Sequence, residues 1–327
     1  MALRSTAEQA SPRAGRTIAI DAQLVRKCTA EFLGTAILVF VGAGVATVMF
    51  GFHAFGTSVA AGVVAVALAF GLVLIGLVAM IGPISGCHVN PAVTLGAYLT
   101  KRIDPVDAVG YALSQLIGGI VGALLLLWVL NGSLFYAKSR NGLGANGYGS
   151  LSLLRMSGGG AFLAEVILTA IFVLVVLSAT REDASRAVAG VVAGLTLGLA
   201  NLMAVPIDGA SINPARSLGP ALITGGLALS QVWLFLLAPL VGGMLAAGIY
   251  LLFHQVPASP GPSPLIARLR GEPVPTHASA DEELRPAGQG TAASATEPRP
   301  TSGTVAAGPD PADPTELPRP GEPPRGP

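Results

Sequence analysis

Long apolar segments alternate with short polar segments from about residue 28 to residue 253. Each apolar segment is close to the roughly 20 residues that a helix needs to cross a bilayer. We place six of them, at about residues 28–49, 58–80, 106–130, 160–180, 187–206 and 230–253. The pattern predicts an all-α membrane protein with six transmembrane helices.

Two shorter apolar segments each begin with the same motif, Asn90-Pro91-Ala92 in the first case and Asn213-Pro214-Ala215 in the second. Asn is a favoured helix N-cap, and Pro fits the first helical position because its missing N–H would have no partner there. The stretches that follow, at about 90–99 and 213–223, are too short to cross a bilayer alone. We therefore expect two half-membrane helices, one between the second and third spans and one between the fifth and sixth.

The chain also contains an internal repeat. Residues 85–99 align with residues 208–222 at seven identical positions of fifteen, and residues 30–40 align with residues 164–174 at six of eleven. Each half then holds three spans and one Asn-Pro-Ala motif. Because three is odd, the second half is inverted relative to the first. In such inverted repeats, sites lie at the interface of the repeats near the middle of the membrane.

Composition agrees with this class and excludes others. The chain is 52% hydrophobic and only 11% charged, whereas a soluble domain is nearer a quarter charged. A net charge of +1 without a basic patch argues against a nucleic-acid partner. The cysteines, Cys28 and Cys87, and the four scattered histidines show no metal-ligand spacing. With no catalytic set or phosphate loop either, we expect no metal, no cofactor and no enzymatic activity.

Charge and composition also suggest how the chain is organised. An even number of spans puts both termini on one side, and Lys and Arg favour the cytoplasm for that side. We expect a cytoplasmic N-terminal segment at 1–27 and a channel domain at 28–256, with repeats at about 28–130 and 160–253. The segment 257–327 is rich in Pro, Ala and Ser and is expected to be a disordered cytoplasmic tail. The location expected for such a multi-pass protein is the cell membrane, plasma or inner.

These features resemble the major intrinsic protein family, the aquaporins and glycerol facilitators, and among them most closely the bacterial aquaporin-type water channels. The resemblance covers about residues 25–255 and is carried by both motifs, Ser85-Gly86-Cys87-His88-Val89-Asn90-Pro91-Ala92-Val93 and Ser211-Ile212-Asn213-Pro214-Ala215-Arg216-Ser217. It implies an aquaporin-like fold in membrane lipid, with two half-helices meeting at their N-termini. It also implies a homotetramer in which each subunit has its own pore.

Asn90 and Asn213 are the candidate centre of the pore. The half-helices would present two positive dipole ends there. Each Asn oxygen would cap its helix, which leaves the amide NH₂ group free to donate to a water molecule. A water held by both donors cannot readily pass a proton along the file, and the positive field repels cations. The alternative is that the two residues are only helix caps.

Arg216 follows the second motif, and a charge inside a membrane protein is costly and usually functional. The resemblance implies that it forms a selectivity filter with Phe70, Asn201 and Ala210. Water channels of the family usually carry His at the position of Asn201 and glycerol facilitators a small residue, so Asn201 matches neither. The alternatives are an Arg216 that reaches the outer surface and a Phe70 that only packs.

Four further residues are expected to line the pore or brace its loops. Glu31 and Glu165 are expected to bond the backbone of the motif loops, the alternative being proton-coupling carboxylates. His88 and Cys87 are expected at the cytoplasmic half of the pore, although His88 could instead brace the loop. The Gly- and Ser-rich segment 131–159 is expected to cover the outer mouth.

The sequence therefore predicts a passive channel that conducts water in single file and excludes protons and ions. The resemblance assigns Ser217 and Ala221 to the water-channel pattern. The alternatives are a channel that also passes glycerol or other small neutral solutes, and an ion-coupled secondary transporter, which also uses inverted repeats.

Overall fold

The computed structural model describes residues 21–52, 58–181 and 184–253. The chain divides into two units, Met1–Val274 and Pro275–Pro327, and all the described residues belong to the first. Within them every regular element is a helix, and six helices are long and apolar enough to cross a membrane. The all-α fold with six spans is thus confirmed. The tail expected at 257–327 lies outside the described residues, as do positions 1–20 of the expected N-terminal segment.

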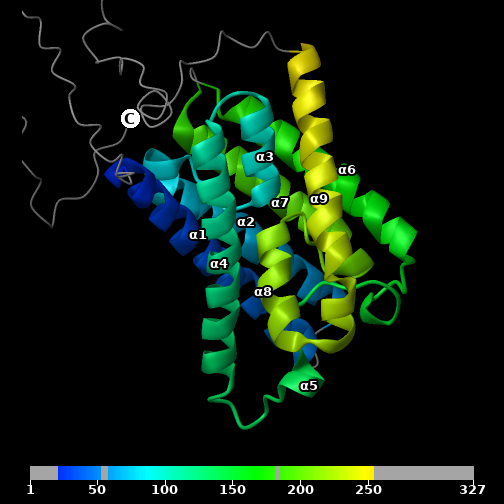
Figure 1. The fold of residues 1–327 in the computed structure, drawn as a ribbon. Helices are drawn as coiled ribbons and strands as arrows, with labels where there is room; N and C mark the ends of the chain where they lie inside the picture. Colours follow the sequence, from blue (N-terminus) through cyan, green and yellow to red (C-terminus); the bar gives the residue numbers. More distant parts are fainter. Residues whose placement is uncertain (1–20, 53–57, 182–183, 254–327) are drawn as a thin grey trace, which may run out of the picture. The chain divides into compact units, whose positions relative to one another are not determined.

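Six long helices and two short ones carry the architecture (Figure 1). The long ones are α1 (Ala22–Ala46, continued by the π-helical turn η1, Thr47–Gly51), α2 (Val59–Ser85), α4 (Pro105–Leu130), α6 (Gly158–Ala179), α7 (Arg186–Asp208) and α9 (Gly226–Phe253). The short ones that follow the Asn-Pro-Ala motifs are α3 (Pro91–Leu99) and α8 (Pro214–Thr224). The segment between α4 and α6 holds α5 (Lys138–Asn141) and the 3₁₀ turn η3 (Gly149–Leu151).

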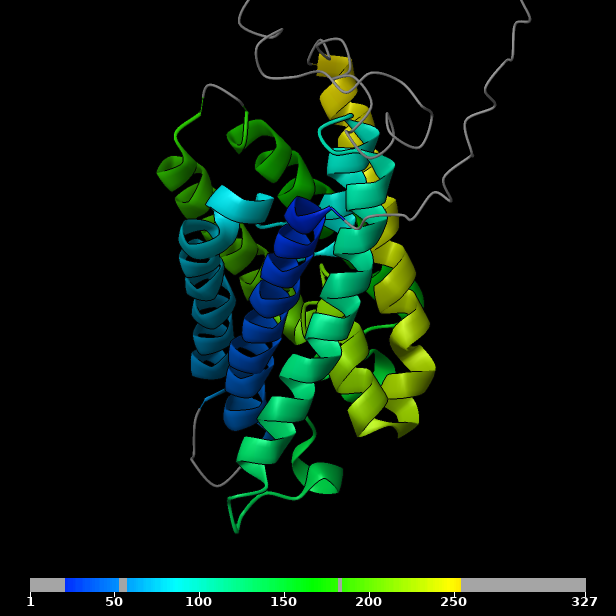
Figure 2. The same ribbon diagram turned by 60° about the vertical axis from the view of Figure 1, so that its left-hand side comes forward.

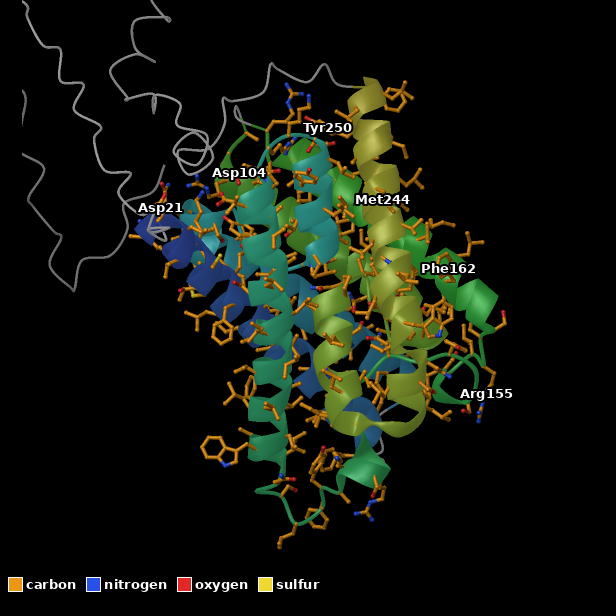
Figure 3. The ribbon with its side chains drawn as sticks, viewed as in Figure 1. Asp21, Asp104, Arg155, Phe162, Met244 and Tyr250 are labelled. Carbon is orange, nitrogen blue, oxygen red and sulfur yellow. The ribbon has the colours of Figure 1, made fainter. Side chains whose placement is uncertain are left out.

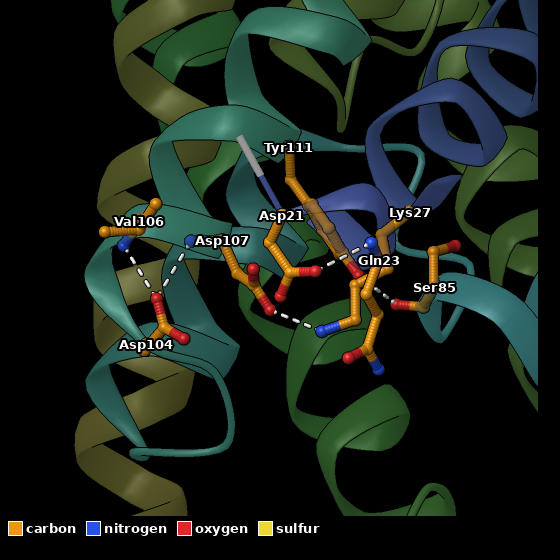
Figure 4. Close-up of polar contacts among 8 residues, drawn as sticks. All are labelled: Asp21, Gln23, Lys27, Ser85, Asp104, Val106, Asp107 and Tyr111. Atoms are coloured by element: carbon orange, nitrogen blue, oxygen red, sulfur yellow. Dashed lines mark hydrogen bonds and ion pairs between the residues drawn. The ribbon is translucent and has the colours of Figure 1, made fainter. Parts of the chain in front are cut away.

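Helix α1 begins six residues before the predicted span, because Asp21 caps it. The Asp21 carboxylate accepts a hydrogen bond from the backbone N–H of Gln23 at 3.0 Å. The added turn is polar, and Lys27 Nζ lies 2.7 Å from Asp107 Oδ2 in the first turn of α4 (Figure 4). A hydropathy pattern does not reveal this first turn, because the turn contains the charged residues Arg26 and Lys27 and does not lengthen the apolar segment.

Helix α2 runs five residues beyond its predicted end and passes through Pro83. It stops at Gly86, whose φ of 89° is left-handed and whose N–H bonds the Gly82 carbonyl at 3.1 Å. Helix α7 stops in the same way at Gly209, with φ of 88°. Left-handed C-caps favour glycine because it carries no Cβ, so the two repeats end their second span by one shared device.

Packing follows the repeat. The most extensive contacts join α1 to α4, α6 to α9, and α2 to α7 across the halves. Each short helix also packs against the last long helix of the opposite half, α3 on α9 and α8 on α4. In Figure 1, α3 lies in the upper part of the bundle and α8 below it, and Figure 2 shows the same order from another side. This is the inverted arrangement that the repeat predicts.

The outer faces of the long helices carry apolar side chains. Met244 on α9, for example, is 47% exposed along the middle of its helix (Figure 3). Polar residues gather at the helix ends, with Asp21 and Asp104 toward one end and Arg155 toward the other. A surface that is apolar along the middle of the helices and polar at their ends matches the cross-section of a bilayer. With six such spans the chain is a multi-pass membrane protein.

Two glycines hold the short helices close to the long ones. A Cβ at Gly119 of α4 would overlap the carbonyl oxygen of Ala215, and a Cβ at Gly243 of α9 would lie 2.6 Å from that of Ala92. Ala92 and Ala215 are the third residues of the two motifs, and both are fully buried. Small residues of this kind let helices approach closely in lipid. The motif Ala of each half therefore rests on a glycine of the other half.

We expect Gly243→Ala to lower the free energy of unfolding by about 1–3 kcal/mol, because the backbone of α3 must move to admit the methyl group. Gly248→Ala is the matched control on the same helix, since nothing lies within 4 Å of its added Cβ. Thermal unfolding in detergent, followed by circular dichroism, measures both variants. Equal midpoints would show that this contact does not hold α3 in place.

Candidate pore

The loops that precede the two short helices share one unusual backbone. In each loop three residues have positive φ at equivalent positions: Gly86, Cys87 and Val89 (89°, 57° and 43°) in the first, and Gly209, Ala210 and Ile212 (88°, 54° and 56°) in the second. Non-glycine residues in this region are uncommon and strained, so the surrounding structure must hold them there.

Glu31 of α1 holds the first loop. Its carboxylate is fully buried and accepts four hydrogen bonds, from His88 N (2.9 Å), Val89 N (2.6 Å), Ser85 Oγ (2.6 Å) and Gln115 Nε2 (2.7 Å). A buried carboxylate is costly unless it is satisfied in this way. Two of its donors are backbone groups of the loop, which fixes the path of the chain into α3.

Glu165 of α6 holds the second loop at the equivalent place. It is fully buried and accepts from Ser211 N and Ile212 N, both at 2.7 Å. Both glutamates therefore lie against the motif loops, which is the geometry expected for loop bracing. Beside Glu165 lies one further carboxyl group, that of Asp208 at the end of α7.

At one equivalent position the two motif loops carry different side chains, Ser85 in the first half and Asp208 in the second. Asp208 Oδ1 accepts from Ala210 N at 3.0 Å as Ser85 Oγ accepts from Cys87 N at 3.2 Å. Ser85 also donates its hydroxyl hydrogen to Glu31, whereas Asp208 places a second carboxyl group beside Glu165. Asp208 is 1% exposed, and among the described residues its Oδ2 has no hydrogen-bond partner. Its charged neighbours are Glu165 and Arg216.

We expect Asp208→Ser to raise the free energy of unfolding by about 1–3 kcal/mol, because it removes a buried unsatisfied oxygen and supplies a donor for Glu165. The change copies the first half of the molecule. Ser85→Ala is the control and should lower stability, since it removes the existing donor to Glu31. Thermal unfolding measures both variants, and a destabilised Asp208→Ser would mean that the Asp208 carboxylate stabilises the second loop.

Asn90 and Asn213 cap α3 and α8 and join the two loops. Each Oδ1 accepts from the N–H two residues on, Ala92 or Ala215, at 2.9 Å. Each Nδ2 donates to the opposite loop, Asn90 to the Ile212 carbonyl and Asn213 to the Val89 carbonyl, both at 2.8 Å. The prediction that both amides are wholly free to donate into a pore is therefore wrong. One N–H of each amide ties the halves together, and one remains.

A cavity lies along the two loops. Half of its lining residues are apolar, namely Leu38, Phe70, Leu74, Val89, Phe172 and Leu197, and half are polar or charged, namely His88, Asn90, Asn201, Ser211, Asn213 and Arg216. Such a lining is typical of sites for small molecules. Most candidate residues thus share one cavity. Cys87 and Ala210 are not part of this lining and are buried, with 7% and 1% of their surface exposed.

Arg216 is 1% exposed, so its side chain does not reach the outer surface. Its Nη1 donates to the Gly144 carbonyl at 2.9 Å and to Asn146 Oδ1 at 2.7 Å, and its Nη2 donates to the Gly209 carbonyl at 3.3 Å. These three hydrogen bonds hold the guanidinium against protein acceptors.

Asn146 is a functional candidate that sequence reasoning missed. It is buried, and its Oδ1 also accepts from Ser217 Oγ at 2.8 Å. It lies in the segment expected to cover the outer mouth, so this segment also positions the Arg216 side chain. The available sequence signal was the run Gly144-Ala145-Asn146-Gly147, whose two glycines mark a turn around a polar residue.

Phe70 forms a wall beside Arg216. Its ring centroid lies 5.1 Å from the Arg216 Cζ, within the range of a cation–π contact. One edge of the ring packs on Gly42 of α1, where an added Cβ would overlap three ring atoms. Phe70 is therefore held between a glycine and the guanidinium.

We expect Gly42→Ala to lower solute permeability severalfold without unfolding the protein, because the added methyl group pushes the Phe70 ring toward the cavity. Gly44→Ala is the control on the same helix, since its added Cβ meets only a flexible Leu126 side chain at 3.2 Å. Osmotic shrinkage of proteoliposomes measures both. Unchanged permeability in Gly42→Ala would mean that the ring does not border the conducting path.

Asn201 and His88 complete the polar lining. Asn201 on α7 is 2% exposed, and its Nδ2 donates to the Leu197 carbonyl at 2.9 Å. His88 Nδ1 lies 3.1 Å from Thr94 Oγ1, and its ring meets that of Tyr111 edge-on at 5.2 Å between centroids. Tyr111 is itself fixed by a 2.8 Å bond to the Ser85 carbonyl (Figure 4). His88 thus both lines the cavity and is held by its neighbours.

An inverted repeat of six spans, with two capped half-helices facing one cavity, defines a membrane channel. The model of the major intrinsic protein family matches residues 19–250, and this chain belongs to that family. Its members of this type are passive channels, not enzymes.

The relatives agree on the bacterial aquaporin type. Aquaporin Z of Photorhabdus laumondii is 40% identical over 233 residues, which cover 71% of this chain and 99% of the relative. Aquaporin Z of Rhodopseudomonas palustris is 39% identical over 231 residues, 71% of this chain and 94% of the relative. Among solved structures, the aquaglyceroporin from Plasmodium falciparum superposes with a TM-score of 0.61 at 27% identity, covering 69% of this chain and 95% of that one.

Proposed function

We propose that this channel conducts water in single file and excludes protons and ions. The observation that carries the proposal is the pair of capping amides, Asn90 and Asn213, in a cavity whose other walls are mostly apolar. A water passing Leu38 or Phe172 finds no hydrogen-bond partner in those side chains. It therefore bonds its neighbours in the file and the few polar groups that face it.

Proton exclusion follows from the remaining amide hydrogens. After the cross-loop bonds, each Asn keeps one N–H, and both residues line the same cavity. A water that accepts from both has its lone pairs engaged, so it cannot accept a proton from the next water in the file. The N-terminal ends of α3 and α8 add positive potential at the same level. Both effects oppose H₃O⁺ and metal cations.

Arg216, with Phe70, Asn201 and Ala210, is the proposed filter. The guanidinium keeps its charge in a buried site, where it repels cations more strongly than it would in water. Glu31 and Glu165 are proposed to brace the loops, and His88 and Cys87 to lie on the opposite side of the Asn pair.

A channel that also passes glycerol is the second candidate. Asn201 is smaller than the His usual in water channels, Ala210 is small, and the structural neighbour is titled an aquaglyceroporin. The relatives at about 40% identity are titled Aquaporin Z, which favours water.

We further propose that the protein is a homotetramer in the cell membrane with both termini in the cytoplasm. The excess of Lys and Arg in the N-terminal segment supports this orientation. Exposed apolar side chains on every long helix supply surface for both lipid and neighbouring copies.

Stopped-flow light scattering on proteoliposomes tests the solute. We expect fast shrinkage in an impermeant osmolyte, little re-swelling in glycerol, and no acceleration of proton entry as reported by an entrapped pH-sensitive dye. Empty liposomes give the baseline. Fast glycerol re-swelling would favour the second candidate, and water flux at the baseline would overturn the proposal.

A further inference from the structure

Glu165 has fewer hydrogen-bond donors than its counterpart in the first half. Glu31 accepts from two backbone N–H groups and from the side chains of Ser85 and Gln115. Glu165 accepts from two backbone N–H groups of the second loop, and neither Ser nor Gln stands at the matching positions. Both carboxyl groups are fully buried, so the second lacks two side-chain donors that satisfy the first.

The missing Gln donor follows from the sequence of α9. Residues 114–119 of α4 match residues 238–243 of α9, and each run ends in Gly-Gly, whose last glycine lies against a short helix. Gln115 therefore corresponds to Pro239, which has neither a polar side chain nor an N–H group. A donor to Glu165 can then come only from the position that matches Ser85, and this position is Asp208.

Asp208 places an unpaired oxygen beside Glu165. Its Oδ1 accepts from Ala210 N at 3.0 Å, and its side chain lies within hydrogen-bonding reach of Glu165. Among the described residues Oδ2 has no partner, although the side chain is almost fully buried. Two carboxylates that face each other in a buried site do not both ionise, whereas a carboxyl group and a carboxylate form a hydrogen bond through one proton.

The charges around the two carboxyl groups also favour one bound proton. Glu165 of α6 and Arg216 of α8 are the charged groups that face Asp208. Helix α2, which packs along α7, has no titratable side chain. In the segment between α4 and α6, Tyr148 packs on the first turn of α6 and Arg155 is exposed. Arg216 therefore balances one carboxylate, and a second would leave a buried net negative charge.

We propose that Asp208 and Glu165 share one proton, bound at Asp208 Oδ2, and that Asp208 is thereby a positioning residue for the second loop. The proton lets Asp208 donate to Glu165 as Ser85 donates to Glu31. The brace of the second loop then exists only while the proton is bound, whereas a hydroxyl group that does not titrate braces the first. Loss of the proton would loosen the loop that leads to Asn213.

The pH dependence of stability tests the shared proton. Both carboxyl groups are ionised in the unfolded chain at neutral pH, so the folded state binds one more proton than the unfolded state. Between about pH 6 and pH 8 the pair should raise the unfolding equilibrium constant about tenfold per pH unit. Asp208→Asn keeps the shape of the side chain and donates to Glu165 without a proton, so this rise should be absent from it.

Equilibrium unfolding in mixed detergent micelles measures both proteins at each pH. The ratio of their constants removes the groups that titrate in both. Asp208→Ser is a second variant in case the first does not fold, and its ratio to the wild type should have the same slope. The stabilisation expected of Asp208→Ser should thus be larger at higher pH. A ratio that does not change with pH would overturn the shared proton.

Infrared spectra and water flux test where the proton lies and what it does. The spectrum of the wild type minus that of Asp208→Asn should show the C=O stretch of a protonated carboxyl group at neutral pH, and its absence would overturn the proposal. Raising the pH until this band disappears should lower the water permeability of wild-type proteoliposomes severalfold, with no such fall in Asp208→Asn. Unchanged wild-type flux after the band has gone would overturn the positioning role.

These outcomes are distinct from a failure of the proposed function. If wild-type flux stays at the level of empty liposomes at every pH, the water channel is overturned. The unfolding ratio and the infrared band would still report the proton, because neither depends on the conducted solute.

Discussion

Irregular backbone inside a bilayer must find its hydrogen-bond partners within the protein, because lipid offers none. The loops before α3 and α8 are such backbone, and three of the five residues in each lie in the left-handed region. Glu31 and Glu165 accept their N–H groups, and Asn90 and Asn213 bond their carbonyls from the opposite half. Without these bonds neither half-helix could begin where it does, and the cavity beside them would lose its polar side.

Local and periodic features of the fold could be predicted from the sequence. Runs of about 20 apolar residues decide the spans, and Asn followed by Pro decides where a short helix begins. Contacts between distant residues could not be predicted in this way. Asn146 is 70 residues from Arg216, and no local pattern ties them. The alignment pairs Ser85 with Asp208, but the effect of that difference depends on Glu165, a residue of another helix.

The repeat is symmetric in backbone and asymmetric in chemistry. On the side of the first loop, His88, Thr94 and Gln115 form a neutral network that ends at Glu31. On the side of the second loop, charged groups gather around Arg216. The two inverted halves give both ends of the cavity the same backbone framework. Different residues at matching positions of the repeat then give the two ends different polar groups.

The hydrogen bonds between the two loops also limit how early during translation the first half can complete its contacts. Asn90 and its acceptor at Ile212 are 122 residues apart. A ribosome adding about 5–20 residues per second takes roughly 6–25 s to cover that interval. Throughout it the first loop lacks the cross-half bonds that it makes in the folded protein. The first half therefore cannot complete its loop contacts before the second half emerges.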